Sequence, residues 1–243
     1  ISKMNILVTG HKGFIGSHVF KHLQDEGHEV RGLDKPDDIR DFIRFYACDS
    51  IRYDVIVHLA AFAALRESVQ DPNKFWENNV IKTKPIFDYC KINKIRLLYA
   101  SSAGAHEWWQ NPYAITKKVN ESMAPPNSVG MRFFNVWAEE GSRDDMLYRM
   151  LQDNTAQYIT RHRRDWIHVN DIATAISCLL PDNFRGVLDI GTGKNHSVLE
   201  LAMKMGRSDL PILDHTPNEP DSLCADTTTL RSLGWSPTID ILD

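Results

Sequence analysis

Tyr113 and Lys117 are the residues whose types and spacing most directly suggest chemistry. They form a Tyr-x-x-x-Lys pattern, and residues four apart on a helix share one face about one turn apart. A nearby cation favours the deprotonated form of a phenol. We therefore predict that Lys117 lowers the pKa of Tyr113 and that Tyr113 acts as a general base. Alone the pattern is weak, because most such pairs lie on solvated helix faces.

A glycine-rich turn about a hundred residues earlier gives this pair its context. Gly10, Gly13 and Gly16 follow an apolar run over 5–9 that is typical of a buried strand. They precede a helix predicted over 14–26. Glycines let the backbone approach a pyrophosphate, and a helix N-terminus offers free N–H groups to it. The turn therefore predicts a dinucleotide site.

Asp34 extends this interpretation to the identity of the dinucleotide. It ends a second predicted strand over 29–33, at about the distance from Gly10 where an acid binds the adenosine ribose. Its charge would repel a 2′-phosphate, so NAD is favoured over NADP. The neighbouring Lys35 weakens that preference a little.

Composition bounds the class of protein. A chain of 243 residues with 25% charged and 42% hydrophobic residues can bury one large globular core. The net charge of −4 gives no reason to expect a nucleic acid partner. No run is apolar enough to cross a membrane and no signal peptide is evident, and Met4 is the expected natural start. Four scattered cysteines without C-x-x-C spacing favour a cytoplasmic location and no metal site.

The alternation of predicted elements indicates an α/β fold, a doubly wound parallel sheet of the Rossmann type. Further strands are expected over 53–59, 95–100, 129–136, 166–169 and 186–190, and helices over 72–92, 112–123, 143–151 and 171–180. After residue 137 the pattern loosens, which predicts a small interleaved C-terminal substrate lobe. We expect the NAD-binding domain over 4–137, with 165–192 returning to it, and the lobe over 138–164 and 193–243.

These motifs, in this order, resemble the extended short-chain dehydrogenase/reductases, specifically the NAD-dependent nucleotide-sugar epimerase/dehydratase family. The resemblance runs from Met4 to about Pro237, and the stretch over 60–80 is most similar to the UDP-sugar 4-epimerases. Its landmarks are Thr9–Gly16, Asp38–Asp41, His58–Ala61, Asn78–Val80, Ser101–Ala103, Tyr113–Lys117, Arg132–Val136, Arg164–Val169 and Leu233–Pro237.

The resemblance implies a cofactor site for NAD. The pyrophosphate would be bound by Gly10, Gly13, Phe14 and Ile15, and the adenosine ribose by Asp34. Adenine would be contacted by Asp38 and Ile39. The cofactor groove would be lined by Leu59, Ala60 and Ala61, and the active-site region would be supported by Asn79.

The resemblance also implies the reacting groups. Tyr113 would be the base, Lys117 would bind the nicotinamide ribose, and Ser102 would hydrogen-bond the reacting sugar hydroxyl. Asn135 and Arg164 would hold the nucleotide diphosphate of the substrate, and the planar fork of arginine suits phosphate.

Family members pair two helices across a two-fold axis to form a four-helix bundle. The helices over 72–92 and 112–123 would do so here, which predicts a homodimer. Phe87, Tyr89 and Cys90 would then need burial, although they could instead pack only on their own sheet.

The chain also departs from the family pattern. Only eleven positions separate Ser102 from Tyr113, a short segment for this family. A second phosphate-binding arginine, expected near 218–221, is absent, and Arg143, Arg161 or Arg163 could substitute for it. These departures leave the substrate less certain than the cofactor.

The positions after Ser102 narrow the reaction. Related dehydratases carry an acid/base pair there, whereas this chain has Ala103 and Gly104, which cannot transfer protons. A 4-epimerase acting on a UDP-sugar through a transient 4-keto sugar needs only Ser102, Tyr113, Lys117 and NAD. Two alternatives stay open, an oxidoreductase with net NAD(H) turnover on a nucleotide sugar or a small substrate, and an inactive NAD-binding regulatory protein.

Overall fold

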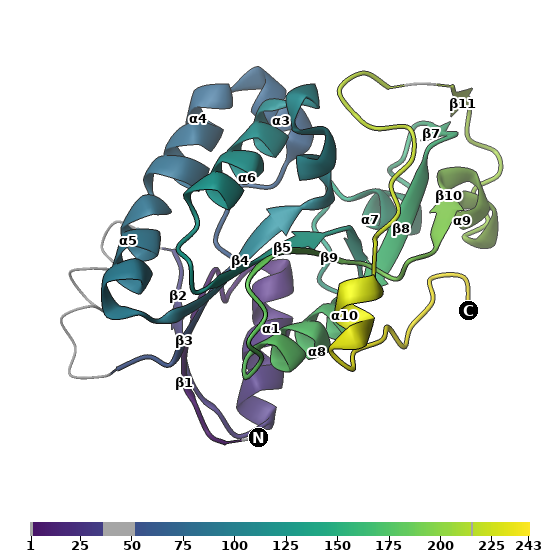
Figure 1. The fold of residues 1–243 in the computed structure, drawn as a ribbon. Helices are drawn as coiled ribbons and strands as arrows, with labels where there is room; N and C mark the ends of the chain where they lie inside the picture. Colours follow the sequence, from purple (N-terminus) through teal and green to yellow (C-terminus); the bar gives the residue numbers. More distant parts are fainter. Residues whose placement is uncertain (1, 36–51, 215) are drawn as a thin grey trace.

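A six-stranded parallel sheet forms the centre of the computed structural model, which describes residues 2–35, 52–214 and 216–243 (Figure 1). The strand order is β2-β1-β3-β4-β5-β9, so the order reverses between β1 and β3. This architecture confirms the predicted doubly wound fold. The strands are β1 (Asn5–Thr9), β2 (Glu29–Leu33), β3 (Val55–His58), β4 (Arg96–Ser102), β5 (Ser128–Phe133) and β9 (Gly186–Ile190).

The inner strands are apolar because both faces of the sheet are covered. Successive side chains of a strand point to opposite faces. Ile6 and Val8 accordingly belong to one hydrophobic core, and Leu7 between them belongs to another. All three side chains are fully buried.

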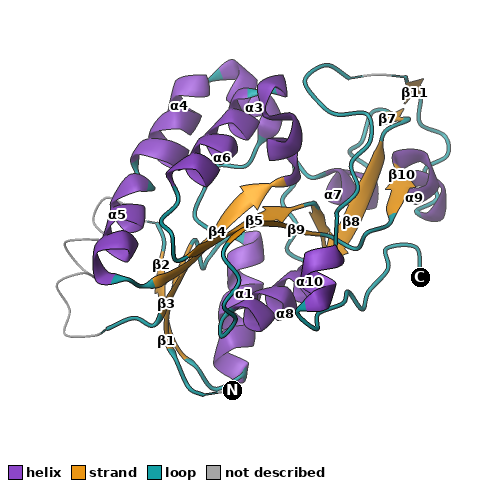
Figure 2. Ribbon diagram, viewed as in Figure 1, coloured by secondary structure: helices purple, strands orange, loops and turns teal. Residues whose placement is uncertain are grey.

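Helices from distant parts of the chain cover the two faces (Figure 2). α1 (Phe14–Asp25) and α8 (Val169–Leu179) pack against one another and share the first core. α5 (Lys84–Asn93) packs on the other face, with α6 (Pro112–Met123) beside it. α3 (Leu65–Gln70) and α4 (Pro72–Trp76) pack against α6.

The single helix predicted over 72–92 is wrong in detail. The structure divides it into α4, a π-helix η2 (Glu77–Ile81) and α5. Pro85 lies in the first turn of α5, and a proline cannot donate the backbone hydrogen bond that would continue a helix. The wider π turn buries the Asn79 side chain beneath the surface, and such turns are frequent at functional sites.

The strand predicted over 129–136 is also divided in the structure. β5 ends at Phe133 in the central sheet, and β6 (Asn135–Trp137) pairs with β8 (Arg163–His168) in a second sheet. Phe134 between them is buried and its N–H donates to the Ile190 carbonyl. This change of sheet turns the chain from the central domain into the small lobe.

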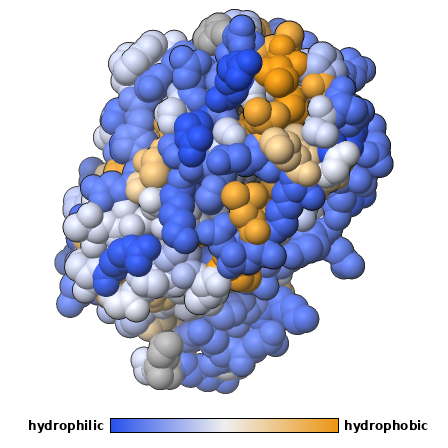
Figure 3. All heavy atoms as spheres, turned by 90° about the vertical axis from the view of Figure 1, so that its right-hand side faces the viewer, coloured by the Kyte–Doolittle hydropathy of each residue, from blue (hydrophilic) through white to orange (hydrophobic). Residues whose placement is uncertain are grey.

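The small lobe is assembled from several returns of the chain around its own core, which contains Trp137, Trp166 and Leu201. The face that includes this lobe is mostly hydrophilic with separate apolar spots (Figure 3). α7 starts later than the predicted helix over 143–151, because residues 143–146 form a turn. The remaining elements are η3 (Ala103–Gln110), α7 (Leu147–Gln152), β7 (Ile159–Thr160), β10 (Asn195–Ser197), α9 (Val198–Lys204), β11 (Ile212–Leu213) and α10 (Thr228–Ser232).

Among residues 2–35, 52–214 and 216–243, no helix has both the length and the apolar character needed to span a bilayer. The same residues contain no group of three or more His, Cys, Asp or Glu side chains that could hold a metal ion.

Candidate active site

A cleft of about 1160 Å³ lies at the carboxyl ends of the central strands and extends to the small lobe. Ligands of open parallel sheets bind at this edge, where the strand order reverses. The volume is slightly above the range of about 300–1,000 Å³ that is usual for small-molecule pockets. Its lining includes many predicted site residues: Gly10, Gly13, Phe14, Ile15, Leu59, Ala61, Ser102, Tyr113, Lys117, Asn135 and Arg164.

The glycine-rich turn has the shape that a pyrophosphate requires. Gly10 has φ of +72°, and a Cβ there would lie 2.7 Å from the Ala60 backbone nitrogen. A Cβ on Gly16 would lie 1.9 Å from the Gly10 carbonyl oxygen, so only glycine allows α1 to start this close to β1. No side chain caps the N-terminus of α1 at Gly13, which leaves its first N–H groups available to an anion. The turn therefore fits a dinucleotide.

Asp34 lies just after β2, next to the glycine-rich turn. Its carboxylate accepts hydrogen bonds from the backbone nitrogens of Lys12, at 2.7 Å, and Lys35, at 2.8 Å. These bonds fix the orientation of the carboxylate beside the turn. Asp38 and Ile39, the predicted adenine contacts, lie outside the described residues.

Helix α6 presents Tyr113 and Lys117 to the cleft one turn apart. Asn111 caps the helix by accepting from the Ala114 N–H at 2.8 Å, and Pro112 occupies the first turn. Lys117 is buried, its Nζ donates to the Ala100 carbonyl at 2.9 Å, and it lies 5.7 Å from the centre of the Tyr113 ring. Burial lowers the pKa of Lys117 to about 8.

The predicted lowering of the Tyr113 pKa is wrong. Burial raises this pKa, and a hydrogen bond with Ser102 and the charge of Arg143 oppose the rise only in part. The Lys117 Nζ donates to the Ala100 carbonyl and is not one of the groups that oppose the rise. Of the two groups that favour the phenolate, Ser102 has the larger effect.

Asn79 connects three parts of the site from the π-helix. Its Oδ1 accepts from the Phe62 N–H at 2.8 Å, and its Nδ2 donates to the Phe62 carbonyl at 2.9 Å and to the Thr116 hydroxyl at 3.2 Å. Asn120 of α6 donates in turn to the Asn79 carbonyl. The side chain therefore fixes the loop after β3 to the helix that carries Tyr113.

His58 likewise joins separate segments of the chain, on the cofactor side of the cleft. Its ring nitrogens lie 2.7 Å from the Thr9 hydroxyl and 3.0 Å from the Thr83 hydroxyl, and the Ala60 N–H donates to the Thr9 hydroxyl. Burial, with a smaller contribution from the Lys117 charge, lowers the pKa of His58 to about 3. The folded protein therefore holds this histidine neutral.

We predict that His58 makes the fold sensitive to acid. Its folded pKa is below the ordinary value of 6.5, so between these values the unfolded chain binds more protons, and stability falls as pH falls below about 6.5. The loss approaches about 1.4 kcal/mol per pH unit. Urea unfolding at pH 7.5 and 5.0 should show a smaller pH dependence for His58→Gln than for the wild type. Equal pH dependence in the two proteins would exclude this role.

Arg164 is placed in the cleft, but its guanidinium already has partners. It is 6% exposed, and it donates to His162 Nδ1 at 3.1 Å and to the backbone carbonyls of Arg163 and Asp221 at 3.0 and 3.4 Å. It also pairs with Glu219, another residue of the cleft, at 3.4 Å. Burial lowers the pKa of Arg164, and the charge of Glu219 opposes that effect.

The sequence interpretation missed several residues at this end of the cleft. Trp166 and Thr216 line it, and each has a buried polar side-chain atom without a partner among the described residues. Trp166 stands two positions after Arg164 on β8, and strand alternation could have placed both on one face. Thr216 and Glu219 gave no signal, because their position depends on a loop.

The segment that forms most of this cleft identifies the family of the protein. Residues 6–191 match the NAD dependent epimerase/dehydratase family. The chain belongs to that family. The dependence of that family on NAD confirms the predicted cofactor, and the shape of the glycine-rich turn fits NAD.

Individual epimerase/dehydratase relatives are distant. Protein CapI of Staphylococcus aureus is 30% identical, with 73% of this chain and 69% of the relative covered. A UDP-glucose 4-epimerase of Lactobacillus helveticus is 26% identical, with 99% of this chain and 94% of the relative covered. That match extends over 310 residues, so the relative has insertions where this chain is short.

Solved structures confirm the fold. The chain is similar to Thermus thermophilus UDP-glucose 4-epimerase in complex with NAD, with a TM-score of 0.81, 22% identity, and 98% and 97% of the two chains covered. It is also similar to an NAD-dependent NDP-hexosamine 5,6-dehydratase, with a TM-score of 0.86, 23% identity, and 99% and 94% covered. Both reaction types therefore occur on this fold.

Proposed function

We propose that this family member is a nucleotide-sugar epimerase that inverts carbon 4 of a UDP-sugar. The observation that supports this best is the meeting of Ser102, Tyr113 and Lys117 with the glycine-rich turn in one cleft. Ala103 and Gly104, which follow Ser102, have no side chain that could transfer a proton. The site therefore has the groups that move a hydroxyl proton and lacks, at these two positions, those that would expel water.

The residues divide the work in the proposed reaction. NAD, when bound, supplies the acceptor and donor of hydride. Tyr113 takes the proton of the sugar 4-hydroxyl and returns it later. Ser102 favours the Tyr113 phenolate, and its hydroxyl would donate a hydrogen bond that orients the sugar hydroxyl. Gly10, Gly13, Phe14 and Ile15 would hold the pyrophosphate of NAD, Asp34 its adenosine ribose and Lys117 its nicotinamide ribose.

One assay separates this function from its alternatives. The protein is mixed with NAD⁺ or NADP⁺ and a panel of UDP-sugars, epimers are measured by NMR, and NADH is followed by absorbance. We expect 4-epimers with NAD⁺ and not with NADP⁺, because Asp34 repels a 2′-phosphate. We expect no net NADH, because the hydride is returned to the sugar. Stoichiometric NADH would indicate the oxidoreductase, and a 4-keto or unsaturated product would indicate dehydration. Binding of NAD without turnover would indicate the regulatory protein.

Glu219 should weaken the binding of the substrate diphosphate. Its carboxylate occupies Arg164 from within the cleft, so a diphosphate must displace it or lie beside a like charge. We predict that Glu219→Gln binds UDP more tightly than the wild type, on the order of tenfold. Isothermal titration with UDP measures this.

A matched control removes the same charge elsewhere in the lobe. Asp214 is paired with Arg161 and its side chain is 85% exposed, so Asp214→Asn should leave the affinity for UDP unchanged. Weaker binding of UDP by Glu219→Gln would mean that the carboxylate contacts the ligand favourably.

A homodimer through a four-helix bundle remains a proposal. Phe87 and Cys90 give it no support, because both are already buried on their own sheet. The support comes from Trp76, Ile81 and Ile92, which are 43%, 47% and 78% exposed on α4, η2 and α5, near one edge of the molecule (Figure 1). Light scattering at micromolar concentration should give twice the mass of the chain, and Trp76→Glu should give a monomer. A monomeric wild type would refute the dimer.

The cytoplasmic location also stays a prediction from the cysteines.

A further inference from the structure

The short segment between Ser102 and Tyr113 folds as η3, which begins immediately after Ser102. The Ser102 hydroxyl caps it by accepting from the Gly104 N–H at 3.1 Å. Ser102 lines the cleft together with Tyr113 and opposes the rise that burial causes in the pKa of that phenol. The position of the Ser102 hydroxyl therefore depends on the first turn of η3, residues 103–106.

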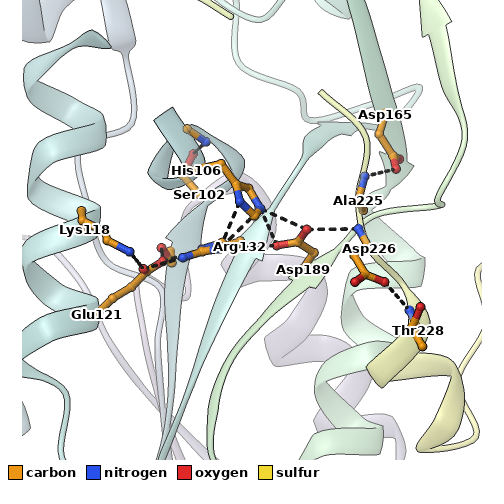
Figure 4. Close-up of polar contacts among 12 residues, drawn as sticks. Ser102, His106, Lys118, Glu121, Arg132, Asp165, Asp189, Ala225, Asp226 and Thr228 are labelled. Atoms are coloured by element: carbon orange, nitrogen blue, oxygen red, sulfur yellow. Dashed lines mark hydrogen bonds and ion pairs between the residues drawn. The ribbon is translucent and has the colours of Figure 1, made fainter. Parts of the chain in front are cut away.

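His106 ends this turn and attaches it to the central sheet. Its Nε2 lies 2.8 and 3.0 Å from the two carboxylate oxygens of Asp189 on β9. Its Nδ1 lies 3.2 Å from Arg132 Nη1 on β5. Figure 4 shows His106 between these two side chains, close to Ser102. The Nε2–H can donate to the Asp189 carboxylate, and Arg132 can only donate to the ring, because arginine has no acceptor.

The partners of His106 are themselves held in place. Arg132 makes two hydrogen bonds of 2.8 Å with Glu121 of α6, the helix of Tyr113 and Lys117. Asp189 is 6% exposed and also accepts from the Asp226 N–H at 3.1 Å. The anchor is therefore rigid, and it connects the Ser102 turn, the Tyr113 helix and a segment next to the small lobe.

The turn that follows Ser102 packs against α6, and its Ala103 packs with Phe134 and Ala225. Ala103 and Ala105 are buried, but they offer only methyl groups to the packing. Trp108 and Trp109, later in η3, are 42% and 63% exposed. His106 is consequently the side chain of η3 whose polar contacts reach across the sheet to both β5 and β9.

We propose that His106 is a positioning residue, which holds the first turn of η3 on Asp189 and Arg132 and thereby fixes the Ser102 hydroxyl beside Tyr113. The kinetic part of this proposal rests on the proposed function, whereas the positioning itself does not. Misplacement of a reacting group by about 1 Å can cost up to about a hundredfold in rate. A loss between about ten- and a hundredfold in kcat is therefore expected for His106→Ala.

The first experiment measures kcat, KM and NAD affinity for three variants. His106→Ala should lower kcat with little change in NAD affinity, and Asp189→Asn should do the same. His106→Gln should recover part of kcat, because its amide can still donate to Asp189. The control is His196→Ala, which removes another partly exposed histidine beside a carboxylate, Asp240, and should leave kcat unchanged.

Two comparisons separate positioning from a general structural role. In a Ser102→Ala background, His106→Ala should cause no further loss of kcat, because its effect acts through Ser102. The Tyr113 titration, obtained from the ultraviolet difference spectrum against Tyr113→Phe, should move to higher pH in His106→Ala, since a displaced Ser102 would no longer favour the phenolate.

The outcomes are distinguishable. An unchanged kcat and an unchanged Tyr113 titration in His106→Ala would overturn the proposal, and so would an equal loss of kcat in the Ser102→Ala background. If the wild type converts no nucleotide sugar, the proposed function fails, and the titration alone decides the role of His106. If His106→Ala does not fold, His106→Gln and Asp189→Asn decide it by the same measurements.

Discussion

Replacing Tyr113 with phenylalanine should lower turnover by roughly 10²- to 10⁴-fold, the usual contribution of a general base. The change removes one hydroxyl and keeps the ring, which packs edge to face with Phe75 with the ring centroids 6.5 Å apart. Packing, the free energy of unfolding and NAD affinity should therefore stay close to the wild type. Turnover is measured with the best UDP-sugar of the panel, and unfolding with urea.

Two further variants give this prediction its specificity. Lys117→Ala should reduce both turnover and NAD affinity, because it removes a buried cation next to the tyrosine and a proposed ribose contact. Ser102→Ala should slow turnover and leave NAD affinity unchanged. A structural tyrosine would give the opposite pattern, with altered stability and an unaltered rate. Full turnover by Tyr113→Phe would refute the proposed mechanism and favour the regulatory alternative.

Gly16→Ala should have the largest effect on the cofactor groove. A methyl group at this position would lie 1.9 Å from the Gly10 carbonyl oxygen and 2.7 Å from its carbon, both backbone atoms. α1 must then move away from the turn after β1. We expect a loss of about 2–3 kcal/mol in the free energy of unfolding and a fall in NAD affinity of at least about tenfold.

The control for this variant is the next residue of the same helix. Ser17 is exposed and its hydroxyl donates only to the Phe14 carbonyl, so Ser17→Ala should change neither property appreciably. Urea unfolding and fluorescence titration with NAD measure both. Wild-type NAD affinity in Gly16→Ala would mean that the turn does not bind the pyrophosphate.

The sequence could predict the parts of the site that depend on local order. The strand over 5–9 and the helix over 112–123 occur with the predicted bounds, because hydrophobic periodicity, Pro112 and the glycines act within a few residues. The interruption at η2 was harder to predict from the sequence, because Pro85 shows where a helix restarts but not that the preceding turn becomes a π turn.

The rest of the site depends on contacts between distant residues. Arg164 and Glu219 are separated by 55 positions, and His106 and Asp189 by 83. Spacing in the sequence carries no signal for such pairs, and burial reverses effects that neighbours alone suggest. The raised pKa of Tyr113 is an example, because desolvation outweighs the nearby groups that favour the phenolate.

The interleaving of the small lobe limits how this enzyme can be rebuilt. Asp165 of β8 is fully buried and accepts from the N–H groups of Thr192, Gly193 and Ala225 and from the Thr192 hydroxyl. Asp171 of α8 likewise accepts from Thr238 and Ile239 near the end of the chain. Each carboxylate joins segments that lie far apart in the sequence. The small lobe of a relative cannot therefore be exchanged as a single cassette, and a chimaera must transfer every crossing segment with the loops that these carboxylates hold.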